Sequence, residues 1–315
     1  MTSADSHSHR TDRRKFLTRC SAAASGLLLR GTVKAESQAP APLPTVSLGQ
    51  YHVTRLVVGA NPIAGYSYLG QQIDQEMKAY FTPERTLAFL QRCEREGINT
   101  HQFSPASKAT DVYRKLRERD SKLQLICLHS RRQDIRAIAE ATQLIAMAHH
   151  GGVTDRLFRE GRSGQVRDFV KAVHDHGLLA GVSAHNPDCI RRIADEGWEV
   201  DFFMACFHYL TRPKTPSDPS KELPVLAGPD VGYTFYETDP PAMCQVIRQV
   251  KQPCLAFKIL GAGRRCASQE TVREAFRFAF AHIKPSDRVI VGMYPRLLDQ
   301  VRANTEYTRK LGTVA

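Results

Sequence analysis

The sequence predicts a (β/α)8 TIM barrel, and three observations support this fold class. Eight short β-branched segments alternate with amphipathic helices, as in parallel α/β proteins. They recur about every 35 residues, so the region over 51–315 has the length of about 250 residues that such barrels need. The first turn, "VVGANPIAG", lacks the G-x-G-x-x-G loop of an open doubly wound sheet, which is the alternative architecture.

The predicted strands are short runs dominated by β-branched and other apolar residues. They cover residues 54–60, 98–103, 123–129, 144–149, 178–184, 200–206, 254–260 and 288–293. The clearest helices have apolar residues at three-four spacing, and several begin at Pro, Ser or Asp and end at Gly. They cover residues 83–97, 163–177, 186–198, 240–251 and 268–283.

The first residues resemble a twin-arginine export signal. Arg13 and Arg14 are followed by a variable residue, a Phe-Leu pair and a weakly apolar run over 20–29. That run is too short to span a bilayer, and Ala35 offers a small-residue cleavage site. We therefore expect a signal peptide over 1–35, followed by a Pro/Ala linker over 36–50 and a barrel domain over 51–315.

Composition narrows the partners of the chain. The net charge of +12 falls to +7 without residues 1–35, and the remaining basic residues lie beside acidic ones along the helices. This pattern is typical of solvated helix faces and argues against nucleic-acid binding. The seven cysteines outside the signal show no C-x-x-C spacing, which fits folding before export with buried thiols. We expect a periplasmic or secreted protein whose partners are the export machinery and a small molecule, with no stable membrane insertion after cleavage.

Histidines gather where the predicted strands end. In this fold the residues just past the carboxyl ends of the strands build the active site. Six of the ten histidines outside the signal lie at such ends: His101, His129, His149, His150, His185 and His208. Solvated loop histidines would be scattered over both ends of the barrel, so the sequence predicts a histidine-rich site.

The histidines suit three roles, and the sequence leaves all three open. Imidazoles titrate near neutral pH, so four are candidate catalytic acids or bases: His101, His129, His149 and His150. Imidazoles also bind divalent metal ions, and five are candidate ligands, with Asp155 the nearest carboxylate: His101, His129, His149, His185 and His208. Four polar residues at strand ends are candidate substrate-binding residues: Gln102, His185, His208 and Lys258.

Two loops add candidates for ligand binding. Gly261 and Gly263 in "ILGAGRR" either let backbone amides approach a phosphate beside Arg264 or form a simple tight turn. The polar stretch over 210–239 is too long for an ordinary connection in a compact barrel and is predicted to be a lid. Its aromatic residues suit stacking on sugars or other flat ligands: Tyr233, Phe235 and Tyr236.

Segments spread over residues 54–305 resemble the aldo/keto reductase superfamily. The resemblance rests on "TRLVVGANPIAG", "EGINTHQFSPAS", "GVSAHNPD", "VDFFMACFHYL" and "VIVGMYPRLLDQVRAN", which are similar to the first, second, fifth, sixth and last strand segments of that family. It implies a barrel that binds NADP(H) or NAD(H) and reduces carbonyls with an Asp, Tyr, Lys and His set.

The catalytic set of this family is only partly matched. The resemblance places Gln102 at the family's Asp and Ser107 at its proton-donating Tyr. His129 is the nearest replacement for the Lys, and His149 or His150 matches the fourth-strand histidine. The loss of a positioned acid matters, because general acid catalysis contributes about 10²–10⁴ in rate.

The cofactor positions implied by the resemblance lie on late strands. Ser183 matches a residue that binds the nicotinamide amide, although the Asn that follows it in the family is Ala184 here. Gly292 and Asn304 lie in the last segment, on the cofactor side, and the "GAGRR" loop precedes them.

Three functions follow from these observations. The first is an exported, divergent oxidoreductase that acts on a small carbonyl or sugar-like substrate with a nicotinamide cofactor. The second is a lyase, hydrolase or isomerase that uses the histidine cluster without nicotinamide, with or without a divalent metal ion. The third is a periplasmic binding protein that keeps the barrel and lid without catalysis.

Overall fold

The fold is taken from a computed structural model, which describes residues 41–105, 109–213 and 232–313. The predicted signal over 1–35, the first part of the linker and Ser107 lie outside the described residues. So does most of the predicted lid over 210–239.

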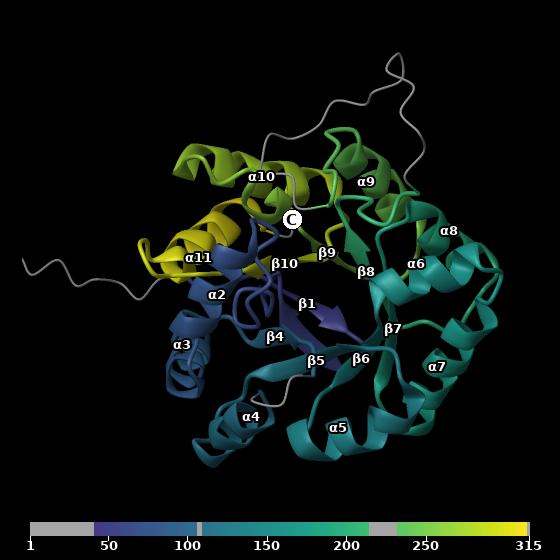
Figure 1. The fold of residues 1–315 in the computed structure, drawn as a ribbon, viewed down its shortest axis with the longest axis horizontal. Helices are drawn as coiled ribbons and strands as arrows, with labels where there is room; N and C mark the ends of the chain where they lie inside the picture. The colour runs from purple at the N-terminus through teal and green to yellow at the C-terminus, as the bar shows by residue number, and fades with distance from the viewer. Residues whose placement is uncertain (1–40, 106–108, 214–231, 314–315) are drawn as a thin grey trace, which may run out of the picture. The chain divides into compact units, whose positions relative to one another are not determined.

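Eight parallel strands close into a barrel, which confirms the predicted fold class (Figure 1). The strands follow one another around the barrel in chain order, and the last pairs with the first in register Gly292↔Gly59. All eight predicted strands are confirmed: β3 (Leu56–Gly59), β4 (Thr100–Phe103), β5 (Gln124–His129), β6 (Ala146–His149), β7 (Leu179–Ala184), β8 (Phe202–Cys206), β9 (Cys254–Phe257) and β10 (Arg288–Gly292).

Helices surround the barrel, as Figure 1 shows. They are α2 (Gln71–Tyr80), α3 (Pro83–Arg95), α4 (Ala109–Glu118), α5 (Ile135–Thr142), α6 (Gly151–Arg159), α7 (Gly164–Asp175), α8 (Pro187–Asp195), α9 (Asp239–Gln249), α10 (Gln269–His282) and α11 (Gln300–Leu311). The five predicted helices are confirmed as α3, α7, α8, α9 and α10. No helix in the described part of the chain is both long and apolar enough to cross a membrane.

Alternation along the strands divides the buried residues into two layers. Val57, Ile126 and Leu255 belong to the cluster that fills the inside of the barrel. Their neighbours along the strands, such as Val58 and Leu125, belong to the larger cluster between the strands and the helices. A strand residue that pairs with one of the inner positions therefore points into the barrel, and one that pairs with an outer position points towards the helices.

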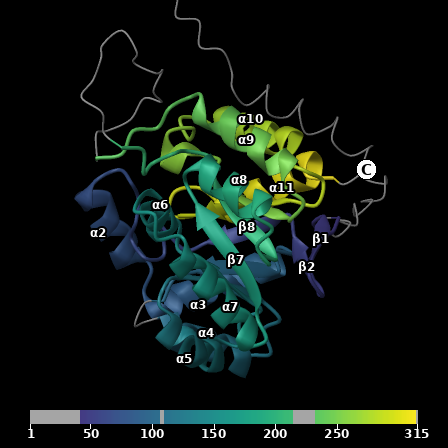
Figure 2. The same ribbon diagram turned by 90° about the vertical axis from the view of Figure 1, so that its right-hand side faces the viewer.

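An antiparallel hairpin of β1 (Thr45–Leu48) and β2 (Tyr51–Thr54) covers the amino end of the barrel. Leu48 and Val53 are fully buried in the inner cluster, and Arg288 donates to the Ser47 carbonyl at 2.9 Å. Figure 2 shows this hairpin at one end of the barrel and α2 and α6 towards the other. The predicted linker over 36–50 is therefore too long, because its last residues form strand β1.

Candidate active site

Strand alternation directs three of the predicted histidines away from the barrel interior. His101 pairs with Leu125, and His129 pairs with His149, which pairs with Val182. Leu125 and Val182 lie in the outer cluster, so all three histidines point towards the helices. Their assignment as catalytic residues stays a prediction, although a side chain in the helix layer faces away from the barrel interior.

The outer contacts of these histidines show what they do instead. His101 is 1% exposed, with Nδ1 3.0 Å from the Val58 carbonyl and Nε2 3.2 Å from the Tyr113 hydroxyl. His149 Nδ1 lies 2.8 Å from the Thr154 hydroxyl, and Asp134 of the turn before α5 lies 2.8 Å from Nε2 of His129. These histidines tie strands to helices.

Two of these histidines, His101 and His149, are buried and are held in the neutral form. Burial lowers the pKa of His101 to about 4, against a smaller upward effect of its hydrogen bond to the Val58 carbonyl. Burial, with the nearby His150 and His129, lowers the pKa of His149 to about 3. Both rings are therefore structural hydrogen-bonding groups at neutral pH.

His150 and His185 do lie at the carboxyl mouth of the barrel. His150 follows β6 and is exposed at its surface, while His185 follows β7 on the inward register of Ser183 and is 9% exposed. Water reaches His150, yet surrounding protein atoms lower its pKa, and the charges of His185 and Lys258 lower it further. Burial also lowers the pKa of His185, although Asp155 opposes this effect.

Asp155, on α6, fixes the position of His185. The carboxylate is 4% exposed and lies 2.9 Å from Nδ1 of His185, and it also accepts the His185 amide at 3.1 Å. The Asn186 amide and the Thr211 hydroxyl donate to it at 3.2 and 2.7 Å. This arrangement sets the tautomer of His185, because Nδ1–H donates to Asp155 and leaves Nε2 with a free lone pair.

The "HHGG" stretch is the start of a helix, where the sequence suggests a polar turn. Gly151 begins α6, and a Cβ there would lie 2.8 Å from the Ser183 hydroxyl and 3.2 Å from the His185 ring. Only a glycine allows this close approach. Because glycine is unfavourable within helices, the sequence does not indicate that a helix begins here. The glycine thus brings α6, with Asp155, against the end of β7.

A tyrosine and a lysine meet at the mouth from two distant segments. Lys258 follows β9, and its Nζ lies 4.5 Å from the ring centroid of Tyr68 in the β3–α2 loop and 5.0 Å from that of Phe257. Burial opposes the charge of Lys258, but the Tyr68 phenol and the Cys206 thiol outweigh it and raise the pKa of this lysine. Lys258 is therefore a cation at neutral pH.

Backbone strain marks the same pair. Tyr68 and Lys258 have left-handed backbone angles, with φ of 60° and 59°. Such angles are uncommon in residues other than glycine and cluster at functional sites. The surrounding structure therefore holds these two side chains together at a cost in local stability.

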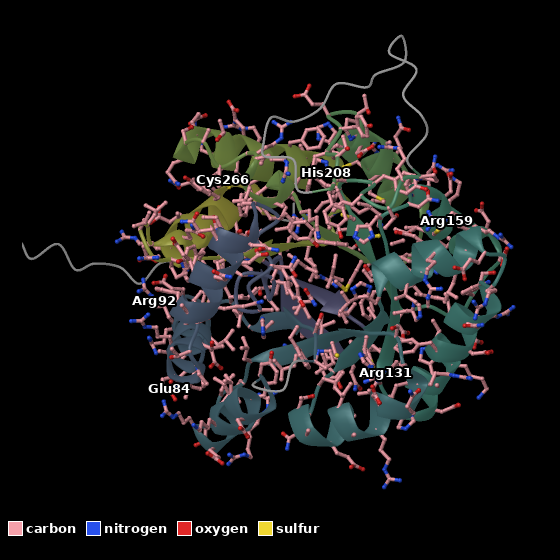
Figure 3. All side chains as sticks on the ribbon, viewed as in Figure 1. Glu84, Arg92, Arg131, Arg159, His208 and Cys266 are labelled. Atoms are coloured by element: carbon pink, nitrogen blue, oxygen red, sulfur yellow. The ribbon has the colours of Figure 1, made fainter. Side chains whose placement is uncertain are left out.

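Aromatic side chains and His208 form another wall of the mouth. Tyr233 and Phe235 contact the ring of Tyr68 edge-on at 5.5 and 6.5 Å. His208 is 1% exposed, and its ring centroid lies 5.0 Å from that of Phe235. The Arg264 guanidinium lies over the Phe235 ring, 3.8 Å from its centroid. Figure 3 labels His208 on the side of the barrel where α9 and α10 lie. Burial, with the charges of Lys258 and Arg265, lowers the pKa of His208 to about 3.

Three amides of the predicted phosphate loop are already used within the turn. The amides of Gly261, Gly263 and Arg264 donate to carbonyls within the same turn, at 2.9, 3.1 and 3.3 Å. A Cβ on Gly263 would meet Leu69 at 3.4 Å, so the β3–α2 loop already lies over it. The simple tight turn is the reading that fits.

The other predicted cofactor residues differ in exposure. Gly292 is exposed at the end of β10, although Pro62 of the β3–α2 loop lies 2.6 Å from where a Cβ on Gly292 would be. Asn304 is 4% exposed on the buried face of α11, and Ser183 is fully buried beneath Gly151. The Ser183 hydroxyl has no hydrogen-bond partner among the described residues, which is the one feature that favours a nicotinamide amide. As a set, these residues do not fit a bound dinucleotide.

The predicted metal site is not assembled. Within the described ranges, no three His, Cys, Asp or Glu side chains lie close enough together to ligate one ion. The reason is geometric, because His101, His129 and His149 point into the helix layer whereas His185 and His208 lie at the mouth. Of the predicted substrate-binding residues, Gln102 lies on the inward register of Ile126 and donates to the Phe103 carbonyl at 2.9 Å.

Comparison with known proteins places the fold. No protein-family model and no curated protein matches the sequence. The holo form of aldo-keto reductase AKR11C1 from Bacillus halodurans aligns with 87% of this chain and 97% of its own, at a TM-score of 0.53 and 12% identity. The similarity shows that this chain has the same (β/α)8 barrel fold. A putative 2,5-diketo-D-gluconic acid reductase B covers 86% of this chain and 87% of its own, at a TM-score of 0.51 and 9% identity.

Sequence reasoning missed Tyr68 and gave Asp155 a different role. Tyr68 lies in the middle of a loop and follows no strand directly, so a search of strand ends passes over it. Asp155 is predicted as the carboxylate nearest to a metal site, whereas in the structure it lies on α6 and orients His185. The tyrosine-rich "GYSYLG" stretch after the first strand is the signal that would have found Tyr68.

Proposed function

We propose that this chain is a divergent member of the aldo/keto reductase superfamily that transfers protons at a carbonyl or hydroxyl carbon of a small sugar-like substrate. The observation that carries the proposal is the pairing of Tyr68 with the cationic Lys258 beside His150 and His185. A phenol, a cation and two neutral imidazoles supply an acid, an oxyanion partner and a base at one site.

Tyr68 is the proton donor in this proposal. Enolisation of a hydroxycarbonyl compound moves a proton from carbon to a base and places negative charge on the carbonyl oxygen. A phenol beside an ammonium group donates its proton to that oxygen readily, because the cation stabilises the phenolate that is left. Tyr68 thus takes the chemical role of the tyrosine that the sequence comparison finds missing, from a different part of the barrel.

His150 and His185 serve as the base in this proposal. Their lowered pKa values keep both imidazoles neutral at pH 7, so each has a lone pair that can take a proton. His185 is oriented by Asp155, which leaves its Nε2 to face the mouth. His150 is the more exposed of the two and is nearer to solvent, so it can also exchange the proton with water.

A small cavity lies against His185, Cys206 and Tyr209 and has a volume of about 40 Å³. A cavity of this size holds water molecules rather than a substrate, so it does not set the size of the substrate. The chemistry of the acid and base groups alone indicates the substrate class, a small hydroxycarbonyl compound, and the reaction, an isomerisation or a related lyase step.

Nicotinamide-dependent reduction of a carbonyl is the second candidate, favoured by the Ser183 hydroxyl that lacks a partner. Nicotinamide would supply a hydride to the same carbon that the acid–base groups face. The burial of Gly261 and Asn304 argues against it.

Solvent exchange tests the proposal. We expect purified protein in D2O to introduce deuterium next to the carbonyl of dihydroxyacetone, glyceraldehyde or xylulose, as followed by NMR. Tyr68→Phe should slow the exchange by about 10²–10⁴, the usual contribution of a general acid. Tyr66→Phe is the matched control, because Tyr66 lies in the same loop with 62% of its surface exposed.

Two outcomes would count against the proposal. Absence of exchange with all three sugars, together with tight NADPH binding by fluorescence titration, would favour the second candidate. Equal exchange by wild type and Tyr68→Phe would remove Tyr68 as the donor.

We also propose that the chain is exported by the twin-arginine route and acts in the periplasm or outside the cell. The support is the Arg13-Arg14 motif with its short apolar run. Folding before export also agrees with the described cysteines, six of which are buried and all of which are unpaired.

A further inference from the structure

Lys258 is a cation without a carboxylate partner in the described structure. Its Nζ lies against the rings of Tyr68 and Phe257, and no described aspartate or glutamate forms an ion pair with it. Charges held within a protein are normally paired, because an unpaired one loses the stabilisation of water without replacement. A bound ligand is therefore the expected source of the negative group that pairs with this ammonium group.

The surroundings favour an anion at this place. His208 is influenced by three cations on the β9 side of the mouth: Lys258, Arg265 and Arg264. Two carboxylates near the mouth are already engaged, Asp155 with His185 and Thr211 and Asp239 with Arg212. The mouth thus presents positive charge to an entering molecule, which raises the local concentration of anions.

His208 adds a second group that lacks a partner. It is 1% exposed, and its Nδ1 has no hydrogen-bond partner among the described residues. The Tyr236 carbonyl accepts a hydrogen bond from this imidazole, so the other nitrogen carries a lone pair. A buried acceptor of this kind is satisfied by a hydroxyl group of a ligand.

We infer that the substrate is a small anionic hydroxy compound, whose carboxylate or phosphate binds Lys258 and whose hydroxyl donates to Nδ1 of His208. This inference rests on the proposed function, since it names the substrate class of the same site. It also explains why a lysine in a strained conformation is held between two aromatic rings, where water competes poorly for its charge.

Calorimetric binding of three matched compounds tests the inference. Glycerol is neutral, D-glycerate carries a carboxylate and glycerol 3-phosphate carries a phosphate, on the same three-carbon frame. We expect one or both anions to bind about tenfold or more tightly than glycerol. The stronger of the two identifies the anionic group.

Variants of Lys258 link this preference to the residue. Lys258→Asn removes the charge and tolerates the left-handed backbone, whereas Lys258→Arg keeps the charge. The preference for anions should disappear in the first and remain in the second, with folding checked by thermal melting. Lys251→Met is the control, because it removes an exposed lysine just before β9.

The results separate this inference from the proposed function. Equal affinity for all three compounds, or a preference that persists in Lys258→Asn, overturns the anion site. Deuterium exchange with neutral sugars in that case would leave the proposed function intact. Anion binding that depends on Lys258 without any exchange would support the site and remove the proposed reaction.

Discussion

Replacement of Asp155 by Asn tests whether this carboxylate holds the mouth together. Asp155 accepts hydrogen bonds from the His185 ring and amide, the Asn186 amide and the Thr211 hydroxyl. An asparagine keeps the shape but turns an NH2 group towards donors, so about two of these bonds are lost. Hydrogen bonds to a charged group contribute about 1.5–3 kcal/mol each, which gives a loss of about 3–6 kcal/mol.

Thermal and urea unfolding measure this loss. A domain of this size changes its Tm by about 2–4 °C per kcal/mol, so we expect Asp155→Asn to lower the Tm by about 10 °C. Asp188→Asn is the control, because its side chain is 73% exposed and surface changes stay within about 0.5 kcal/mol. The pKa of His185, measured by NMR, should also fall further, since Asp155 raises it. A variant within about 1 kcal/mol of wild type, with His185 unchanged, would refute the reasoning.

Three further predictions concern other parts of the chain. His101 and His149 have pKa values of about 4 and 3, below the ordinary 6.5, so the unfolded chain binds more protons between these limits and stability is lost as pH falls below 6.5. Each of these histidines should lower the free energy of unfolding by about 2 kcal/mol between pH 6.5 and pH 5. Equal urea midpoints at pH 7 and pH 5 would contradict this prediction. Gly151→Ala should destabilise the protein by about 1–3 kcal/mol, because the new Cβ would lie 2.8 Å from the Ser183 hydroxyl. Gly152→Ala is the control and should not destabilise it, since the nearest atom lies 3.6 Å away. Similar Tm values for the two variants would count against the close approach. Replacing Arg13 and Arg14 by lysine should leave the precursor in the cytoplasm on cell fractionation, and normal export would exclude the twin-arginine route.

The fold was largely predictable because it depends on periodicity. Each strand is buried on both faces and reads as a short apolar run, and each intervening helix has an apolar stripe. The pattern failed at two places. The hairpin over 45–54 lies in a stretch that looks like the end of a Pro/Ala linker, and α6 begins with the glycines 151 and 152.

The site was less predictable because a strand end has two faces. His149 and His150 are adjacent, yet one points to the helices and the other lies at the mouth. A shift of one residue in the assumed strand register changes the direction of every side chain, and sequence fixes the strand limits only to within a few residues. Tyr68 and Lys258 are 190 positions apart, and only the closure of β10 onto β3 brings their loops together.

The hairpin of β1 and β2 closes the amino end of a barrel whose interior is already filled by side chains. With Leu48 and Val53 packed across that end, a molecule that reacts at the carboxyl end in the proposed way has to enter and leave at that same end. Product and incoming substrate then compete for one opening. Product should accordingly act as a competitive inhibitor of this protein, and the rate of turnover should depend on how fast the mouth is cleared.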